Sequence, residues 1–194
     1  MLDVATAAGS LLAAFGLSGA AGLNAWIPLL AVGLLSRAGQ LDLADAYDWL
    51  ESTPALIGLA AAFVLDFVGD KIPAIDSLLH AAGTIVHPAA GAVVFAGPTE
   101  VPTDVPSIVL FALGAAVAGS LHATRATVRP VSTTMTAGAG NPALSLAEDV
   151  ASAALSVVAV LAPILGAICL LAVVLLAALW WRRIRSTRRR RGPP

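Results

Sequence analysis

The sequence predicts an all-α fold, a polytopic bundle of transmembrane helices with about six spans, some of them broken or short. Of the 194 residues, 58% are hydrophobic and only 12% are charged, whereas about a quarter of the residues are charged in soluble domains. The mean hydropathy is +0.88. Apolar stretches long enough to cross a bilayer recur along the chain. These observations indicate an integral membrane protein and exclude an ordinary soluble domain.

The first apolar stretch, residues 5–36, is longer than a single span requires. Glycines, Asn24 and Pro28 interrupt it. Since about 20 helical residues cross a bilayer, the stretch is either one long, tilted, broken helix or two half-helices that meet near Asn24. The acidic segment 40–54 follows it, and we expect this segment to form a loop or short helix at the surface.

Five further spans are predicted, and residues 55–69 form the shortest of them. Because this helix is too short for a plain span, we expect it to pack inside the protein. The full set is 55–69, 77–96, 107–123, 143–162 and 164–181. Residues 1–181 are thus predicted to form a transmembrane helical domain and residues 182–194 a basic cytoplasmic tail.

The basic residues predict the orientation, because short cytoplasmic loops are rich in Lys and Arg. Seven of the 11 basic residues lie in the tail that begins at Arg182. With six spans and an inside N-terminus, only Arg37 would lie outside. We therefore predict a multi-pass protein of the plasma (inner) membrane with both termini cytoplasmic.

Dividing six spans at the loop 97–106 gives two halves of three spans each. Because three is an odd number, the second half would enter the membrane from the side opposite to the first and have the opposite orientation. This arithmetic predicts a possible 3+3 inverted repeat. The clearest internal match pairs Leu79-His80-Ala81 with Leu121-His122-Ala123. Both copies begin on the inner side, which an inverted pairing does not predict, so the repeat remains a hypothesis.

Ionisable side chains within apolar segments are candidates for function, because burying them in a membrane is costly. Asp66 and Asp70 are four residues apart and would share a helix face, with Lys71 beside them. This arrangement indicates either a carboxylate that handles protons or cations, or an internal ion pair. The three histidines lack the spacing of a zinc site, and we interpret them as packing residues.

Glu148 and Asp149 open the helix that follows Asn141 and Pro142. The spacing from Ser145 to Glu148 predicts a capping box at the helix start. At least one of the two carboxylates should face the protein interior and pair with a nearby arginine. The predicted pathway residues are Asn24, Asp66, Asp70, Lys71, Asp76, Asn141, Glu148 and Asp149, with Arg125 and Arg129 as their charge partners.

Four segments together resemble the membrane family called domain of unknown function 4126. These segments are Gly22-Leu-Asn-Ala-Trp-Ile-Pro-Leu-Leu, Asp70-Lys-Ile-Pro-Ala-Ile-Asp76, His87-Pro-Ala-Ala-Gly91 and Asn141-Pro-Ala-Leu-Ser-Leu-Ala-Glu-Asp149. The resemblance extends from about Leu11 to Pro163. It implies a membrane location and does not imply an activity.

We predict a small transporter or channel-like protein that moves an ion or small solute, with no catalytic residue, metal or cofactor. The alternatives are a membrane enzyme acting on a lipid-linked substrate at the cytoplasmic face, and a non-catalytic scaffold. Expected partners are the bilayer, anionic lipid head groups at the Arg-rich tail and further copies of the chain, but no nucleic acid. A pathway predicts that Asn24, Asp66 and Asn141 converge, whereas an enzyme predicts its carboxylates together at one face.

Overall fold

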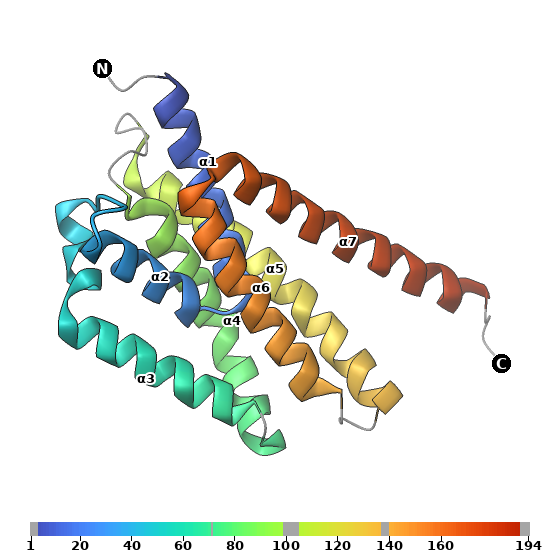
Figure 1. The fold of residues 1–194 in the computed structure, drawn as a ribbon. Coiled ribbons are helices and arrows are strands. Elements are labelled where there is room, and N and C mark those ends of the chain that lie inside the picture. Colours follow the sequence, from blue (N-terminus) through green and yellow to red (C-terminus); the bar gives the residue numbers. More distant parts are fainter. Residues whose placement is uncertain (1–3, 71, 99–104, 137–139, 191–194) are drawn as a thin grey trace.

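The computed structural model describes residues 4–70, 72–98, 105–136 and 140–190, and helices dominate all four ranges (Figure 1). The predicted all-α fold is therefore confirmed. In chain order the elements are α1 (Val4–Leu23), α2 (Trp26–Arg37), the 3-10 helix η1 (Asp45–Glu51), α3 (Thr53–Gly69), α4 (Pro73–Ala96), α5 (Ser107–Thr136), α6 (Asn141–Leu161) and α7 (Pro163–Arg190).

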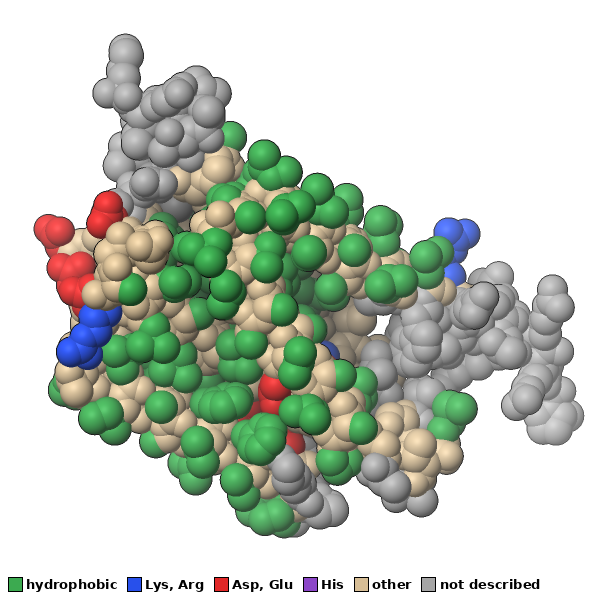
Figure 2. All heavy atoms as spheres, in the orientation of Figure 1, with side chains coloured by type: hydrophobic (Ala, Val, Ile, Leu, Met, Phe, Trp, Pro, Cys, Tyr) green, Lys and Arg blue, Asp and Glu red, His purple; other side chains and the backbone are tan. Residues whose placement is uncertain are grey.

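Three of these helices, α4 from Leu78 onward, α5 and α6, are long and apolar enough to cross a membrane. The bent pair of η1 and α3, with 62° between its two parts, would be a fourth span. The apolar parts of α1, α2 and α7 are shorter. Figure 2 shows hydrophobic side chains over most of the visible face, with acidic side chains gathered at the end where α2 and η1 lie.

Helices α1 and α2 form a hairpin that enters and leaves the bundle at the same end. Gly9 and Ser10 near the start of α1 line one pocket together with residues 39–42, which follow α2. The same loop is joined to the end of α4, because the N–H of Ala44 donates to the carbonyl of Gly97 at 2.9 Å. Residues 5–36 thus form two helices with Asn24 between them.

The hairpin changes the predicted topology. After it, α3 to α7 run alternately up and down, so the start of α1 and the end of α7 lie at opposite ends of the bundle (Figure 1). This differs from the predicted six spans, because α2 turns back toward the start of α1 and only three described helices, or four with the bent pair, are long and apolar enough to cross. The described helices therefore do not divide into two halves of three spans.

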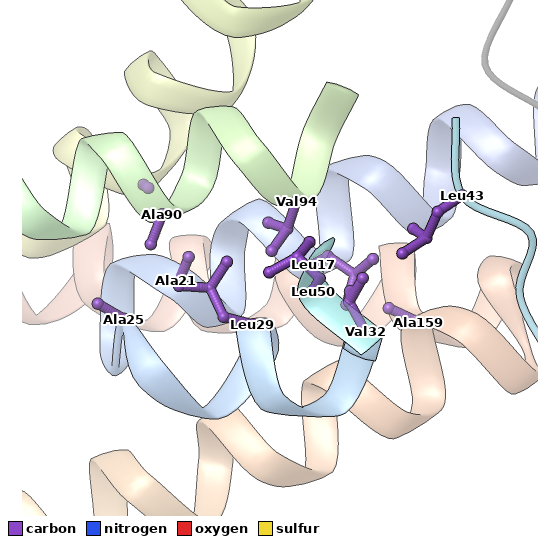
Figure 3. Packing of buried hydrophobic residues seen from close by; sticks show 11 residues of the cluster. Leu17, Ala21, Ala25, Leu29, Val32, Leu43, Leu50, Ala90, Val94 and Ala159 are labelled. Carbon is purple, nitrogen blue, oxygen red and sulfur yellow. The ribbon is translucent and has the colours of Figure 1, made fainter. Parts of the chain in front are cut away.

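Helix α1 packs closely against its neighbours because it is rich in small residues. A Cβ atom on Gly16 would lie 2.6 Å from the Cβ of Ala159 in α6, and one on Gly22 would lie 2.6 Å from the carbonyl oxygen of Ala118 in α5. Figure 3 shows the apolar core around the hairpin, where Leu17 of α1 lies near Val94 of α4. The core holds the hairpin in the middle of the bundle.

Three predicted elements differ from those in the structure. Helix α3 was expected inside the protein, but Ile57 and Leu65 are 64% and 70% exposed, so this almost entirely apolar helix lies at the periphery. Helix α5 continues through Pro130 to Thr136, beyond residue 123, where the predicted span ends. Helix α7 likewise continues past the predicted domain boundary at residue 181.

Candidate functional site at the tip of the hairpin

The break between α1 and α2 leaves backbone groups at both helix ends without partners inside the helices. Asn24 satisfies the amides of α2, because its Oδ1 accepts from the N–H groups of Trp26 at 2.9 Å and Ile27 at 3.2 Å. Asn24 precedes the N-cap residue Ala25, but its side-chain oxygen satisfies the first amides of the helix as an N-cap side chain does. Pro28 in the next position has no N–H that needs a partner. Asn24 is only 2% exposed, so the break lies in the protein interior.

Side chains from three neighbouring helices satisfy the carbonyl groups at the end of α1. His87 of α4 lies with its Nδ1 2.6 Å from the carbonyl oxygen of Ala21. Ser152 of α6 donates to the carbonyl of Ala20 at 2.9 Å. Arg125 of α5 donates to the carbonyl of Leu23. His87 and Arg125 thus replace hydrogen bonds that the break removes, as non-helical backbone in a membrane requires, whereas the carbonyl of Ala20 also accepts from the N–H of Asn24 at 3.0 Å.

The amide nitrogen of Asn24 connects two carboxylates from different helices. It donates to Oδ1 of Asp149 in α6 at 2.8 Å and to Oδ2 of Asp66 in α3 at 3.3 Å. Asp149 is buried and Asp66 is half-buried. Both carboxylates lie at the start of α2, where the helix dipole favours negative charge.

An ion pair also lies at the tip. Nη2 of Arg125 is 2.7 Å from Oε2 of Glu148, and the two side chains are 11% and 10% exposed. Nη1 of Arg125 is 3.4 Å from Nε2 of His87. The carbonyl of Ala21 can only accept, so Nδ1 of His87 carries the hydrogen and Nε2 accepts from Arg125. This arrangement describes a neutral histidine and places the guanidinium at the negative end of the α1 dipole.

Three histidine rings form a column beside this ion pair. The rings of His87 and His122 stack with centroids 4.3 Å apart, and those of His80 and His122 are 5.2 Å apart. Gly83 makes room for them, because a Cβ there would lie 2.8 Å from Cε1 of His122. A small pocket of about 10 Å³, roughly the space of one water molecule, adjoins the column. It is lined by Asp66, Asp70, Leu79, His80, His87, His122 and Arg125.

The structure brings together some of the predicted site residues. Asn24, Asp66 and Asp149 meet at the tip, and Glu148 pairs with Arg125. Asp70 accepts a hydrogen bond from Ser145 and lines the same pocket as Asp66. These residues converge from the break between α1 and α2 and from α3, α5 and α6.

Other predicted residues do not join the cluster or lie outside the described structure. Asn141 lies at the start of α6 and donates to Oγ1 of Thr133 at 2.9 Å, away from the tip. Lys71 lies outside the described residues, and so do the side chains of Asp76 and Arg129.

The capping box predicted from Ser145 and Glu148 is wrong. Helix α6 begins at Asn141 with Gly140 as its N-cap residue, so Ser145 lies inside the helix. It belongs instead to a polar stripe of buried residues that faces the bundle interior: Ser145, Asp149, Ser152 and Ser156. Their spacing of three and four residues places them on one helix face, a signal that the sequence contained.

The histidines also do more than the sequence interpretation assigned to them. His80 and His87 are seven residues apart, so two helical turns place them on one face of α4. His87 contacts the end of α1 and Arg125, which the spacing alone does not reveal. In the part of the chain that the structure describes, no group of three or more His, Cys, Asp or Glu residues is placed to hold a metal ion.

The fold and the site together define a class: an all-helical protein with several helices long and apolar enough to span a membrane, and with a polar, charged centre at the tip of a broken helix pair. Residues 11–183 match the family described as Domain of unknown function (DUF4126), and the chain belongs to this family. The resemblance predicted from the sequence is confirmed. Comparisons with curated proteins and with solved structures found no match.

Proposed function

We propose that the protein is a small transporter or channel-like protein that moves an ion or a small solute along a pathway past the hairpin tip. The observation that carries the proposal is the amide of Asn24, which lies between two helix ends and donates to carboxylates of α3 and α6. Broken helices that meet inside a membrane protein typically form the sites of transporters.

The charges around the tip support this proposal. Ionisable groups within membrane spans mark ion and proton pathways, because their burial is otherwise costly. Here Arg125 pairs with Glu148, and Asp66 and Asp149 both accept from the amide of Asn24. Such a cluster offers a passing ion both charge and hydrogen-bonding groups.

The enzyme alternative requires the carboxylates to gather at one face, where a lipid head group could reach them. Instead, Glu148 pairs with Arg125, Asp149 with Asn24, and Asp70 with Ser145. Glu148 and Asp149 are both buried. This distribution favours a pathway through the bundle over a catalytic centre at its surface.

The sidedness is part of the proposal. By the positive-inside rule, the Arg-rich end of α7 lies in the cytoplasm, which places the start of α1 and the acidic loop after α2 outside. Asp70 and His80 would then lie near the cytoplasmic side of the inner membrane. The proposal also includes two kinds of partner: anionic lipid head groups at the Arg-rich tail and further copies of the chain.

Asp66→Asn should abolish flux while leaving the protein folded. The asparagine can still accept the long hydrogen bond from Asn24, but it cannot carry the negative charge that the pathway uses. The measurement is flux of monovalent ions and small metabolites into liposomes containing the purified protein, with circular dichroism to follow helix content.

Glu51→Gln is the matched control, because Glu51 accepts from Ser36 at 2.8 Å in the outer loop, away from the tip. It should leave flux unchanged. If wild-type liposomes show no flux above empty liposomes, or if Asp66→Asn transports as well as wild type, the proposal fails.

A further inference from the structure

We infer that the ion bound at the hairpin tip is a proton, held by Asp66 and Asp149 on either side of the Asn24 amide. The inference rests on the proposed pathway and names the ion that it handles. Uptake adds one proton to one of the two carboxylates and neutralises it. Release returns the same proton, and no other bond forms or breaks.

The carboxylates of Asp66 and Asp149 lie close together. Both acceptor oxygens lie within 3.3 Å of the same nitrogen atom, so the distance between them is at most about twice that value. Two ionised carboxylates at this separation repel strongly inside a protein, and one shared proton relieves the repulsion. Such a pair titrates as a unit.

The orientation of the Asn24 amide favours a proton over a metal cation as the bound ion. Oδ1 of Asn24 accepts from two backbone N–H groups of α2, and this fixes the orientation of the side-chain amide. The group that faces the carboxylates is therefore the NH₂ donor. A metal cation would require the oxygen there, whereas a carboxyl pair that holds one proton can still accept hydrogen bonds from the amide.

Other charges lie near the Asp66–Asp149 pair. The guanidinium of Arg125 forms an ion pair with Glu148 at 2.7 Å, and it lines the same small pocket as Asp66. The start of α2 favours one ionised carboxylate through the helix dipole, which suits a pair with a single proton. Among the residues that the structure describes, the titratable or charged groups that line the pocket or pair with its lining are Asp70 after α3, His80 and His87 of α4, His122 and Arg125 of α5, and Glu148 of α6.

A proton needs a route between the carboxylate pair and water. The pocket that Asp66 lines extends past Asp70 to the half-buried His80. Histidine is the side chain whose ordinary pKa lies nearest to neutral pH. Polar groups thus lie between Asp66 and His80, independently of any solute that the pathway carries.

Infrared difference spectroscopy of the full-length protein in lipid vesicles tests the inference, because a buried protonated carboxyl group has its own C=O absorption. At neutral pH the wild type should show this band. Asp66→Asn and Asp149→Asn should each remove it, since the remaining carboxylate then has no charged neighbour within the pair and ionises. Each asparagine resembles the protonated form and keeps an acceptor for Asn24, so both variants should fold.

Glu51→Gln is again the control and should keep the band. Sodium and potassium chloride added at constant pH should leave the band unchanged. Absence of the band in the wild type, its persistence in both variants, or its loss on adding either salt overturns the inference. The band is independent of flux, so a protein that shows the band but transports nothing would contradict only the proposed function.

Discussion

Replacing Arg125 with methionine should destabilise the protein by about 3 to 5 kcal/mol, the usual cost of removing one partner of a buried ion pair. The change leaves the buried Glu148 without its guanidinium and removes the donors to the Leu23 carbonyl and His87. The end of α1 would lose part of its hydrogen bonding, so the hairpin itself should loosen. The measurement is the free energy of unfolding in mixed micelles.

Arg37→Met is the matched control, because Arg37 is exposed and donates to Oγ1 of Thr53 at 3.1 Å. Its loss should cost no more than about 1 kcal/mol. Combining Arg125→Met with Glu148→Gln should recover part of the loss, because no buried charge is then left alone. An Arg125→Met protein as stable as Arg37→Met would show that the ion pair does not hold the hairpin.

Replacing Gly91 with leucine should separate α4 from α5 and prevent stable folding. A Cβ at Gly91 would lie 2.4 Å from the Cβ of Ala118 and 2.6 Å from the carbonyl oxygen of Gly114. One of these contacts is backbone, so the helices must move apart. Overpacking of this kind costs about 1 to 3 kcal/mol or more, and here it would also displace the Ser18 hydrogen bond to the Gly91 carbonyl.

Gly58→Leu provides the control, because nothing lies within 4 Å of a Cβ at that position in α3. Leucine is a better helix former than glycine by about 0.5 to 1 kcal/mol, so this variant should be as stable as wild type or slightly more stable. The readout is the amount of monodisperse protein after extraction and its melting temperature. Equal melting temperatures for the two variants would contradict the close packing of α4 and α5.

Much of the fold follows from composition, because apolar stretches and their interruptions are local properties of a sequence. The break near Asn24 and the importance of Asp66, Glu148, Asp149 and Arg125 were predicted from polar residues in apolar surroundings. Their contacts depend on how the helices pack. The sequence predicted the candidates, but it could not predict which of them meet.

The return of α2 to the end where α1 begins could not be predicted, because a 12-residue apolar helix after a break fits either direction. Contacts between distant segments decide it, such as that of Gly22 with Ala118 and the hydrogen bond from Ala44 to Gly97. The role of His87 depends on the same contacts, since its partner is a carbonyl that only the break makes available. Missing the hairpin also led to the prediction of six spans, whereas three described helices, or four with the bent pair, are long and apolar enough to cross.

The hairpin of α1 and α2 decides the topology of the bundle, and cysteine labelling across the membrane tests it most directly. In a Cys169→Ser background, single cysteines would be placed ahead of Met1, at Gln40 and at Met135. Gln40 follows α2 and is exposed, and Met135 is 80% exposed near the far end of α5. An impermeant thiol reagent should label the first two positions from the same side of the membrane and Met135 only from the other side. Labelling of the N-terminal cysteine and Gln40→Cys from opposite sides would mean that residues 4–37 cross the membrane, and would contradict the hairpin.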